Sequence, residues 1–194
     1  MKRLIYLLLV LIIFSLNGVC QSRVALETSL GIIIIELDEQ NAPVTSANFL
    51  RYVDENRWIG AHFYRVVTMQ NQPQNDIKIE VIQGGLGDLD SLRLPTIQHE
   101  PTSKTGILHK NGTFSMARTN PGTENSEFFI CINDQPELDH GGMRNPDGMG
   151  FSAFGKVVEG MNVVLEIQKL PQKNESGQYL KNSFPIYSIK RVSK

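Results

Sequence analysis

Short strand-like segments, separated by glycine, proline and asparagine, run through most of this 194-residue chain. The first, VALETSLGIIIIEL at 24–37, predicts a hairpin that turns near Ser29 to Gly31, because β-branched residues suit a pleated surface. Further strands are expected at 62–67, 78–85, 112–119, 127–133, 151–158 and 185–192. Strands this short and numerous are typical of a closed or nearly closed antiparallel sheet.

Two segments carry the spacing of a helix. The first, at 41–58, has Asn41 as its expected N-cap and Pro43 in its first turn, and its apolar residues recur at Val44, Ala47, Leu50 and Val53. The second, at 160–170, places three apolar residues on one side and ends before Pro171: Met161, Val164 and Leu165. With one helix early and one late, we predict a single domain, a β-barrel with helices over its ends.

The first twenty residues predict export. Two positive charges precede an apolar run over 4–14, and small or polar residues follow. This is the order of a secretory signal, and the run is short for a membrane-spanning helix. We therefore expect residues 21–194 to form the domain, in a periplasmic or other extracytoplasmic space. Three alternatives stay open for the leader: cleavage before Gln21, lipidation of Cys20 as in a bacterial lipoprotein, or an uncleaved anchor.

Composition restricts the partners and the means of stabilisation. Cys20 and Cys131 are the only cysteines, so no disulfide framework holds the domain together if Cys20 is removed or lipidated. Cys131 lies within FFICI, which predicts a buried, inert thiol. The formal net charge is -1, and no Lys/Arg-rich run or nucleic-acid motif occurs. We expect no nucleic-acid partner.

One residue fits its predicted strand poorly. In HFYRVV at 62–67, a period of two places Phe63, Arg65 and Val67 on one face and the remaining residues on the other. An unpaired buried guanidinium would be costly, because it stays charged at any relevant pH. Either Arg65 lies along the surface with its apolar stem covered, or it points into a binding groove.

Separated blocks of the chain then resemble one family. FYRVV, VIQGG, GTFSMART, SEFFICIND, LD and FGKVVEGMNVV follow one another in the order seen in cyclophilins. From about residue 24 onward, the chain resembles a cyclophilin-type peptidyl-prolyl cis-trans isomerase. The resemblance implies a mainly β fold, an eight-stranded antiparallel closed barrel capped by two α-helices, with the substrate groove on its outside. It also implies a monomer without a cofactor that acts on proline-containing polypeptides; membrane contact is expected only through an N-terminal anchor or lipid.

The resemblance assigns roles to single residues. Arg65 matches the catalytic arginine, Gln83 the glutamine that orients substrate and arginine, and Phe129 the floor of the proline pocket. Other positions match residues that contact or flank the substrate: Tyr64, Val81, Ala117, Leu138 and Phe151. The four histidines lie scattered without metal-ligand spacing, so we expect no metal.

The chain departs from the family's pattern near the pocket. TMQNQPQNDIKIE intervenes before VIQGG, and Glu80 falls where relatives carry a pocket aromatic, so Met69 or Ile79 is expected to fill the gap. Glu127 and Arg118 replace a usual glutamine and asparagine near the substrate path, and we expect them to form an ion pair. Glu137 stands where many relatives have tryptophan. These departures keep an alternative open, a cyclophilin-like peptide-binding module or chaperone with little turnover.

Overall fold

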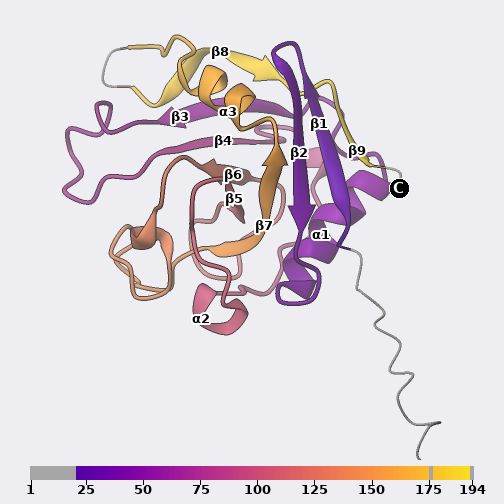
Figure 1. Cartoon of the computed structure of the whole chain (residues 1–194), viewed down its shortest axis with the longest axis horizontal. Coiled ribbons are helices and arrows are strands. Elements are labelled where there is room, and N and C mark those ends of the chain that lie inside the picture. Colours follow the sequence, from indigo (N-terminus) through magenta and orange to yellow (C-terminus); the bar gives the residue numbers. More distant parts are fainter. Residues whose placement is uncertain (1–20, 175–176, 193–194) are drawn as a thin grey trace, which may run out of the picture.

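The computed structural model describes residues 21–174 and 177–192. They form one curled sheet of nine strands in the order β8-β3-β4-β6-β5-β7-β2-β1-β9, with every pairing antiparallel (Figure 1). The strands are β1 (Arg23–Thr28), β2 (Gly31–Leu37), β3 (His62–Val67), β4 (Val81–Gly85), β5 (Thr113–Met116), β6 (Phe128–Cys131), β7 (Ser152–Glu159), β8 (Tyr179–Pro185) and β9 (Ser188–Arg191). The predicted export signal at 1–20 lies outside the described residues.

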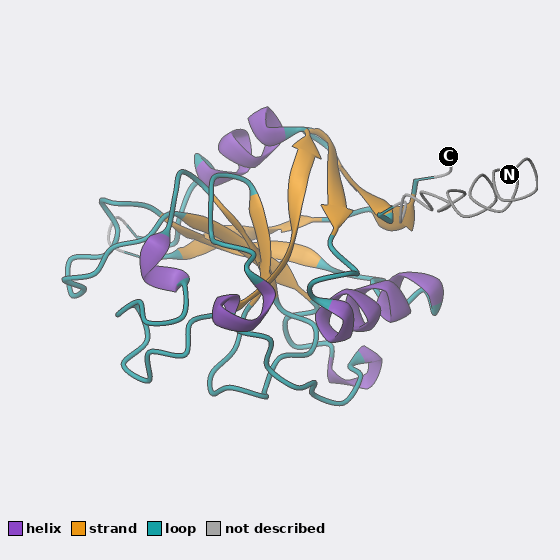
Figure 2. Ribbon diagram, turned by 60° about the horizontal axis from the view of Figure 1, so that its bottom comes forward, coloured by secondary structure: helices purple, strands orange, loops and turns teal. Residues whose placement is uncertain are grey.

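Two principal helices pack on the sheet. α1 (Pro43–Asp54) lies against β7 and β9, and α3 (Met161–Gln168) lies against β2, β3 and β4 (Figure 1). A four-residue helix, α2 (Thr102–Thr105), and two 3₁₀ turns, Asp90–Leu92 and Pro136–Leu138, interrupt the loops. Most long loops gather on the side of the sheet away from α3 (Figure 2). The predicted class, a mainly β antiparallel fold with few helices, is confirmed.

The C-terminal segment accounts for the ninth strand. The strand predicted at 185–192 contains β9, which pairs with β1, whereas β8 was not predicted and pairs with β3 at the other edge of the sheet. Between them, the amide of Ile186 donates to Ala61 and that of Tyr187 to Glu27. Among the described strands no ladder joins β8 to β9. The chain itself therefore links the two edges, and the sheet is curled without being closed by hydrogen bonds.

The helices begin and pack differently from the prediction. Asn41 does not cap α1, since Ala42 holds the cap position without a side-chain bond and the Asn41 amide turns back to Asp38. The buried face of α1 comprises Thr45, Ser46, Asn48, Phe49, Leu50 and Tyr52, so Ala47 is exposed. In α3 the buried residues are Val163, Val164 and Ile167, while Leu165 is exposed. Hydrophobic spacing indicated each helix but misplaced part of its buried face.

Aromatic rings fill the inside of the curled sheet. Phe128 of β6 packs against Phe49, Trp58, Phe63 and Phe114 with ring centroids 5.0–6.0 Å apart. Aromatic side chains bury large apolar areas and add favourable edge-to-face contacts. The described cysteine, Cys131, is a free buried thiol, and burial raises its pKa. Packing therefore carries the stability of the described domain.

A second, smaller apolar cluster lies on the other side of the sheet. Its buried members are Val67, Ile79, Val81, Phe129, Cys131 and Leu138, with Ala117 and Phe151 packed against it. Neighbouring residues of β6 divide between the two clusters, because Phe128 and Ile130 point inside whereas Phe129 and Cys131 point outside. Among the described residues, no helix is long and apolar enough to cross a membrane.

Candidate active site

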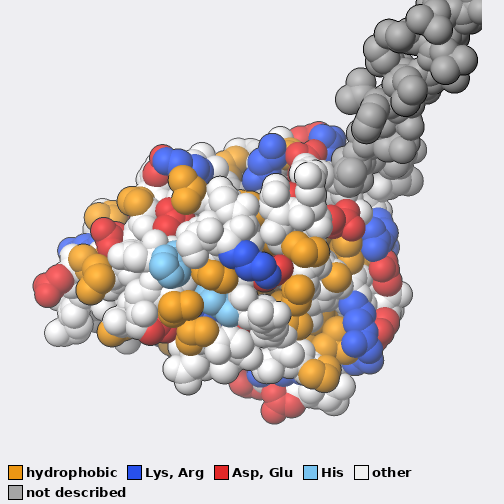
Figure 3. All heavy atoms as spheres, turned by 90° about the horizontal axis from the view of Figure 1, so that it is seen from below, with side chains coloured by type: hydrophobic (Ala, Val, Ile, Leu, Met, Phe, Trp, Pro, Cys, Tyr) orange, Lys and Arg blue, Asp and Glu red, His pale blue; other side chains and the backbone are white. Residues whose placement is uncertain are grey.

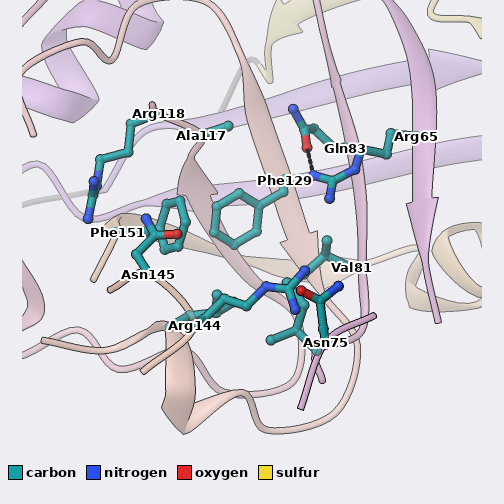
Figure 4. Close-up of a pocket in the computed structure, with 12 residues that line it drawn as sticks. Arg65, Asn75, Val81, Gln83, Ala117, Arg118, Phe129, Arg144, Asn145 and Phe151 are labelled. Carbon is teal, nitrogen blue, oxygen red and sulfur yellow. Dashed lines mark hydrogen bonds between the residues drawn. The ribbon is translucent and has the colours of Figure 1, made fainter. Parts of the chain in front are cut away.

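The outer cluster forms the base of a surface pocket of about 310 Å³. Its lining comes from β3, β4, β6 and the loops around them: Arg65, Asn75, Ile79, Val81, Gln83, Ala117, Arg118, Phe129, Leu138, Arg144, Asn145 and Phe151. Figure 4 shows Phe129 in the middle, with the Arg65 guanidinium and Gln83 on one side and Phe151 and Arg118 on the other. This is an apolar floor rimmed by polar and cationic groups.

Most residues predicted for the site line this pocket together. Eight of them do so: Arg65, Val81, Gln83, Ala117, Arg118, Phe129, Leu138 and Phe151. The other two lie beside it. Glu127 lines an adjoining hollow that also contains Gln83, Ala117 and Arg118, and Tyr64 lines a hollow next to Tyr179. The role of each residue remains a prediction, but their assembly into one site is a property of the fold.

A β-bulge explains why Arg65 leaves the core. The register of β3 against β4 and β8 shifts between Phe63 and Arg65. An extra residue on one strand breaks the alternation of faces, so Phe63 and Val66 both lie in the inner core while Val67 lies in the outer cluster. The strict period of two predicted from the sequence was therefore wrong here.

Two glutamine side chains hold the Arg65 guanidinium. Nη1 donates to Oε1 of Gln83 at 2.7 Å, and Nε donates to Oε1 of Gln178 at 3.0 Å, with Nη2 also directed at that oxygen. Burial lowers the pKa of Arg65 below its ordinary 12.5, yet a guanidinium remains protonated at neutral pH. Gln178 was not predicted, because it lies 113 residues from Arg65 in a polar segment without a motif.

A relay of hydrogen bonds fixes Gln83 in turn. Its Nε2 donates to the Tyr64 hydroxyl at 2.7 Å, and that hydroxyl donates to Oε2 of Glu127 at 2.8 Å. Burial and then the charge of Glu127 raise the pKa of Tyr64 above its ordinary value, so the phenol keeps the proton that it donates. Because the Gln83 amide donates to Tyr64, its oxygen is the atom left to face Arg65.

The floor residue Phe129 is supported from behind. The ring of His109 stacks on it at 5.9 Å, and Phe151 meets its face edge-on at 5.3 Å. His109 is itself buried and held, with Nδ1 2.7 Å from Asp139 and Nε2 3.0 Å from the Ser115 hydroxyl. Phe129 therefore has little freedom to move, which suits a preformed apolar pocket.

The inserted segment 68–80 completes the pocket wall. Ile79 is buried and lines the pocket, as predicted, whereas Met69 is 43% exposed and does not. Glu80 accepts from the Asn133 amide and stays off the lining. Asn71 is buried and its amide donates to Val66, Gln172 and Gly177. The insertion is thus anchored to the same C-terminal segment that supplies Gln178.

The ion pair expected between Arg118 and Glu127 is absent from the described residues. Arg118 instead makes a two-pronged pair with Asp147, at 2.7 and 2.9 Å. The hydrogen bonds from Arg118 hold the pKa of Asp147 at about 2. Glu127 faces away, toward the Tyr64 hydroxyl and the Gly87 amide. The prediction failed because Arg118 pairs with a carboxylate of the loop at 139–150, whereas Glu127 is held by other donors.

Neither a metal-type cluster among the described residues nor a one-sign charged patch on the face seen in Figure 3 marks this chain. Over residues 21–174 and 177–192, no three His, Cys, Asp or Glu side chains gather as a metal site would require. On the face shown in Figure 3, cationic and anionic side chains alternate with hydrophobic ones and form no single-sign patch.

Comparison with known proteins agrees with this geometry. The family model described as cyclophilin type peptidyl-prolyl cis-trans isomerase/CLD matches residues 23–191. A peptidyl-prolyl cis-trans isomerase of Streptomyces antibioticus is 36% identical over 160 residues, covering 80% of this chain and 89% of its own. Peptidyl-prolyl cis-trans isomerase A of Dickeya dadantii is 34% identical over 157 residues, covering 79% and 74%.

Solved structures show the same fold. A cyclophilin type peptidyl-prolyl cis-trans isomerase of Cryptosporidium parvum superimposes with a TM-score of 0.69 at 19% identity, over 90% of this chain and 99% of its own. A second structure of that enzyme, determined in the presence of the dipeptide Ala-Pro, gives 0.68 at 20% identity over 89% and 99%. The chain thus belongs to the cyclophilin-type peptidyl-prolyl cis-trans isomerases.

Proposed function

We propose that this isomerase is exported and accelerates the folding of extracytoplasmic polypeptides by isomerising their X-Pro bonds at the Arg65 pocket. Residues 1–20 support the export, since they have the composition of a secretory signal. The observation that carries the assignment of the site is the guanidinium of Arg65, held by Gln83 and Gln178 at the rim of an apolar pocket floored by Phe129.

The reaction requires rotation about one amide bond. Resonance gives the peptide bond a barrier of about 18–20 kcal/mol, and uncatalysed X-Pro isomerisation takes on the order of tens to hundreds of seconds. As the bond twists, the prolyl nitrogen loses conjugation and gains a localised lone pair. A donor that binds this lone pair stabilises the twisted state more than the planar one, and so lowers the barrier.

Arg65 is the proposed donor. Its guanidinium is planar, permanently charged and already oriented, so little reorganisation accompanies the rotation. Phe129, Leu138 and Phe151 would hold the proline ring while the preceding residue turns. Because an acceleration of about 10⁵-fold corresponds to about 7 kcal/mol, one charged hydrogen bond must act together with this positioning.

A refolding experiment tests the role in folding. A secreted substrate protein whose slow phase is limited by an X-Pro bond should refold faster with catalytic amounts of residues 21–194, and Arg65→Ala should abolish the gain. If the wild type binds the unfolded substrate without accelerating the slow phase, the protein acts as a binding module in that setting.

A fractionation experiment tests the export. The protein expressed from the full chain should be recovered outside the cytoplasm. Mass spectrometry of its N-terminus distinguishes cleavage before Gln21 from a lipid on Cys20 and from an uncleaved leader. Recovery of the intact chain in the cytoplasm alone would contradict the proposal.

A further inference from the structure

Arg144 places a second guanidinium in the pocket that pairs with no carboxylate among the described residues. It comes from the loop at 139–150 and runs along the lower edge of the pocket toward Asn75 and Val81 (Figure 4). Its Nη1 donates to the carbonyl oxygen of Ile77 at 2.6 Å. A neutral carbonyl satisfies one donor and leaves the charge uncompensated.

The rest of the lining does not supply the missing anion. Arg65 also has only neutral partners, the two glutamines, and Arg118 is the one lining arginine paired with a carboxylate, that of Asp147. The twelve lining residues include no aspartate or glutamate. Two guanidinium groups without a carboxylate partner among the described residues therefore face the same small cavity.

Acidic residues on neighbouring segments do not supply the counter-charge. Asp76, next to Ile77, is exposed and forms no ion pair among the described residues. Glu137 accepts the amide of Met143 at 2.8 Å, and Glu127 accepts the Tyr64 hydroxyl on the far side of Gln83. Within the described residues, neither forms an ion pair with Arg144. Burial, followed by the charge of Arg65, lowers the pKa of Arg144.

An anionic ligand would supply the counter-charge that Arg144 lacks. A partly buried cation without a counter-charge has lost hydration without regaining it from a partner. Low-dielectric pocket walls focus the resulting field toward the opening. A carboxylate brought in by a bound peptide would meet a preformed donor, with no protein carboxylate to displace.

We propose that Arg144 is a specificity-determining residue, which favours X-Pro substrates that carry an aspartate or glutamate within two residues of the proline. This inference rests on the assignment of the Arg65 pocket as the isomerase site. It adds the class of substrate, acidic segments around proline, which the family membership does not specify.

The test compares peptides that differ in one charge. Acetylated and amidated peptides with Glu, Gln or Lys at each of the two positions before and after a single proline are assayed by NMR exchange spectroscopy, which needs no coupling protease. An acetyl block is essential, because a succinyl group would itself supply a carboxylate. We expect kcat/KM for the best Glu peptide to exceed that of its Gln counterpart about three- to tenfold, with the Lys peptide lowest.

Variants and salt show whether Arg144 causes the preference. Arg144→Gln should reduce the Glu-to-Gln ratio to about one, and Arg144→Lys should restore part of it. Arg57→Gln is the control for the loss of a cation away from the pocket, where Arg57 pairs with Glu55 and donates to the Leu92 carbonyl. Raising the ionic strength from about 0.01 to 1 M should lower the Glu-to-Gln ratio of kcat/KM in the wild type and leave that ratio unchanged in Arg144→Gln.

The results that would contradict the acidic preference differ from those that would contradict the pocket assignment. Equal kcat/KM for Glu and Gln peptides at every position, or a loss in Arg144→Gln that is the same for all peptides, overturns the acidic preference and leaves the isomerase intact. Failure to accelerate any peptide overturns the pocket assignment and the preference with it.

Discussion

Arg65 and Gln83 face each other across the β3–β4 ladder, and the guanidinium donates to the amide oxygen at 2.7 Å. The contact joins the proposed catalytic donor to a residue that is itself held by Tyr64 and, through it, by Glu127. On the other side, Gln178 holds the same guanidinium from the C-terminal segment. The orientation of Arg65 thus depends on both sides of the site.

Removing Gln178 should therefore impair catalysis without unfolding the protein. Gln178→Ala leaves one of the two acceptors, and the loss of a hydrogen bond to a charged group costs about 1.5–3 kcal/mol where it is not replaced. We expect kcat to fall about 10-fold with a smaller change in KM, and Gln178→Asn to recover part of the activity.

The exposed Gln74→Ala serves as the matched control. It changes the same residue type in the neighbouring insertion and should leave kcat unchanged. Full activity of Gln178→Ala would show that Gln83 alone positions Arg65.

The adjacent phenylalanines of β6 should have opposite phenotypes. Phe128 lies in the aromatic core and Phe129 on the pocket floor. Phe128→Ala should lower the free energy of unfolding by about 3–5 kcal/mol, measured by urea denaturation. Phe129→Ala should lose most of its kcat/KM at a smaller cost in stability. A pair of variants with equal losses of stability and activity would contradict the division of the two faces.

Much of this site follows from the sequence, because its residues lie in short ordered blocks on β3, β4 and β6. The strands position Arg65, Gln83 and Phe129 through local pairing, so a match of those blocks predicts their assembly. Gln178 and Arg144 were missed, because loops bring them to the pocket and no spacing marks them.

The fold, like the site, was predicted from the sequence only in part. Hydrophobic patterns predicted the hairpin at 24–37 and the two long helices. They did not predict β8, because most of its residues are exposed and the strand depends on pairing with β3. The bulge at Phe63–Arg65 likewise arises from pairing with two partners and leaves no mark in the composition of β3.

The insertion at 68–80 should lose its anchor when Asn71 is replaced. Three backbone or side-chain acceptors lie around its buried amide, and its Oδ1 accepts the Thr68 amide. Asn71→Ala leaves these groups unpaired, at an expected cost of about 1–3 kcal/mol of unfolding free energy. Hydrogen exchange of residues 68–79 should accelerate first. Unchanged exchange there would show that Ile79 packing holds the segment by itself.

The stability of the protein should fall as the pH rises above the pKa of His99. Its Nδ1 lies 2.5 Å from Glu124 and its Nε2 3.1 Å from the Met149 carbonyl, so both nitrogens face acceptors and only the charged ring donates to both. Burial opposes the charge, but these hydrogen bonds outweigh it and raise the pKa of His99 above 6.5.

The sign follows from linkage. A raised histidine pKa adds stability that is complete below about 6.5, the pKa in the unfolded chain, and is lost as the pH passes the folded value. Burial opposes ionisation of Glu124, but the hydrogen bond to His99 prevails and lowers the pKa of Glu124. The stability that Glu124 contributes is therefore lost in acid. The free energy of unfolding, measured with urea from pH 4 to 9, should fall less at high pH in His99→Asn than in the wild type. Parallel wild-type and variant curves would contradict the assignment.

The central claim, that the Arg65 guanidinium stabilises the twisted X-Pro bond, is tested most directly by kcat at saturating peptide for the wild type, Arg65→Lys and Arg65→Ala. We expect kcat to fall by at least about 100-fold in Arg65→Ala and less in Arg65→Lys, with folded far-UV spectra and nearly unchanged KM. A folded Arg65→Ala variant that retains nearly full kcat would contradict the account.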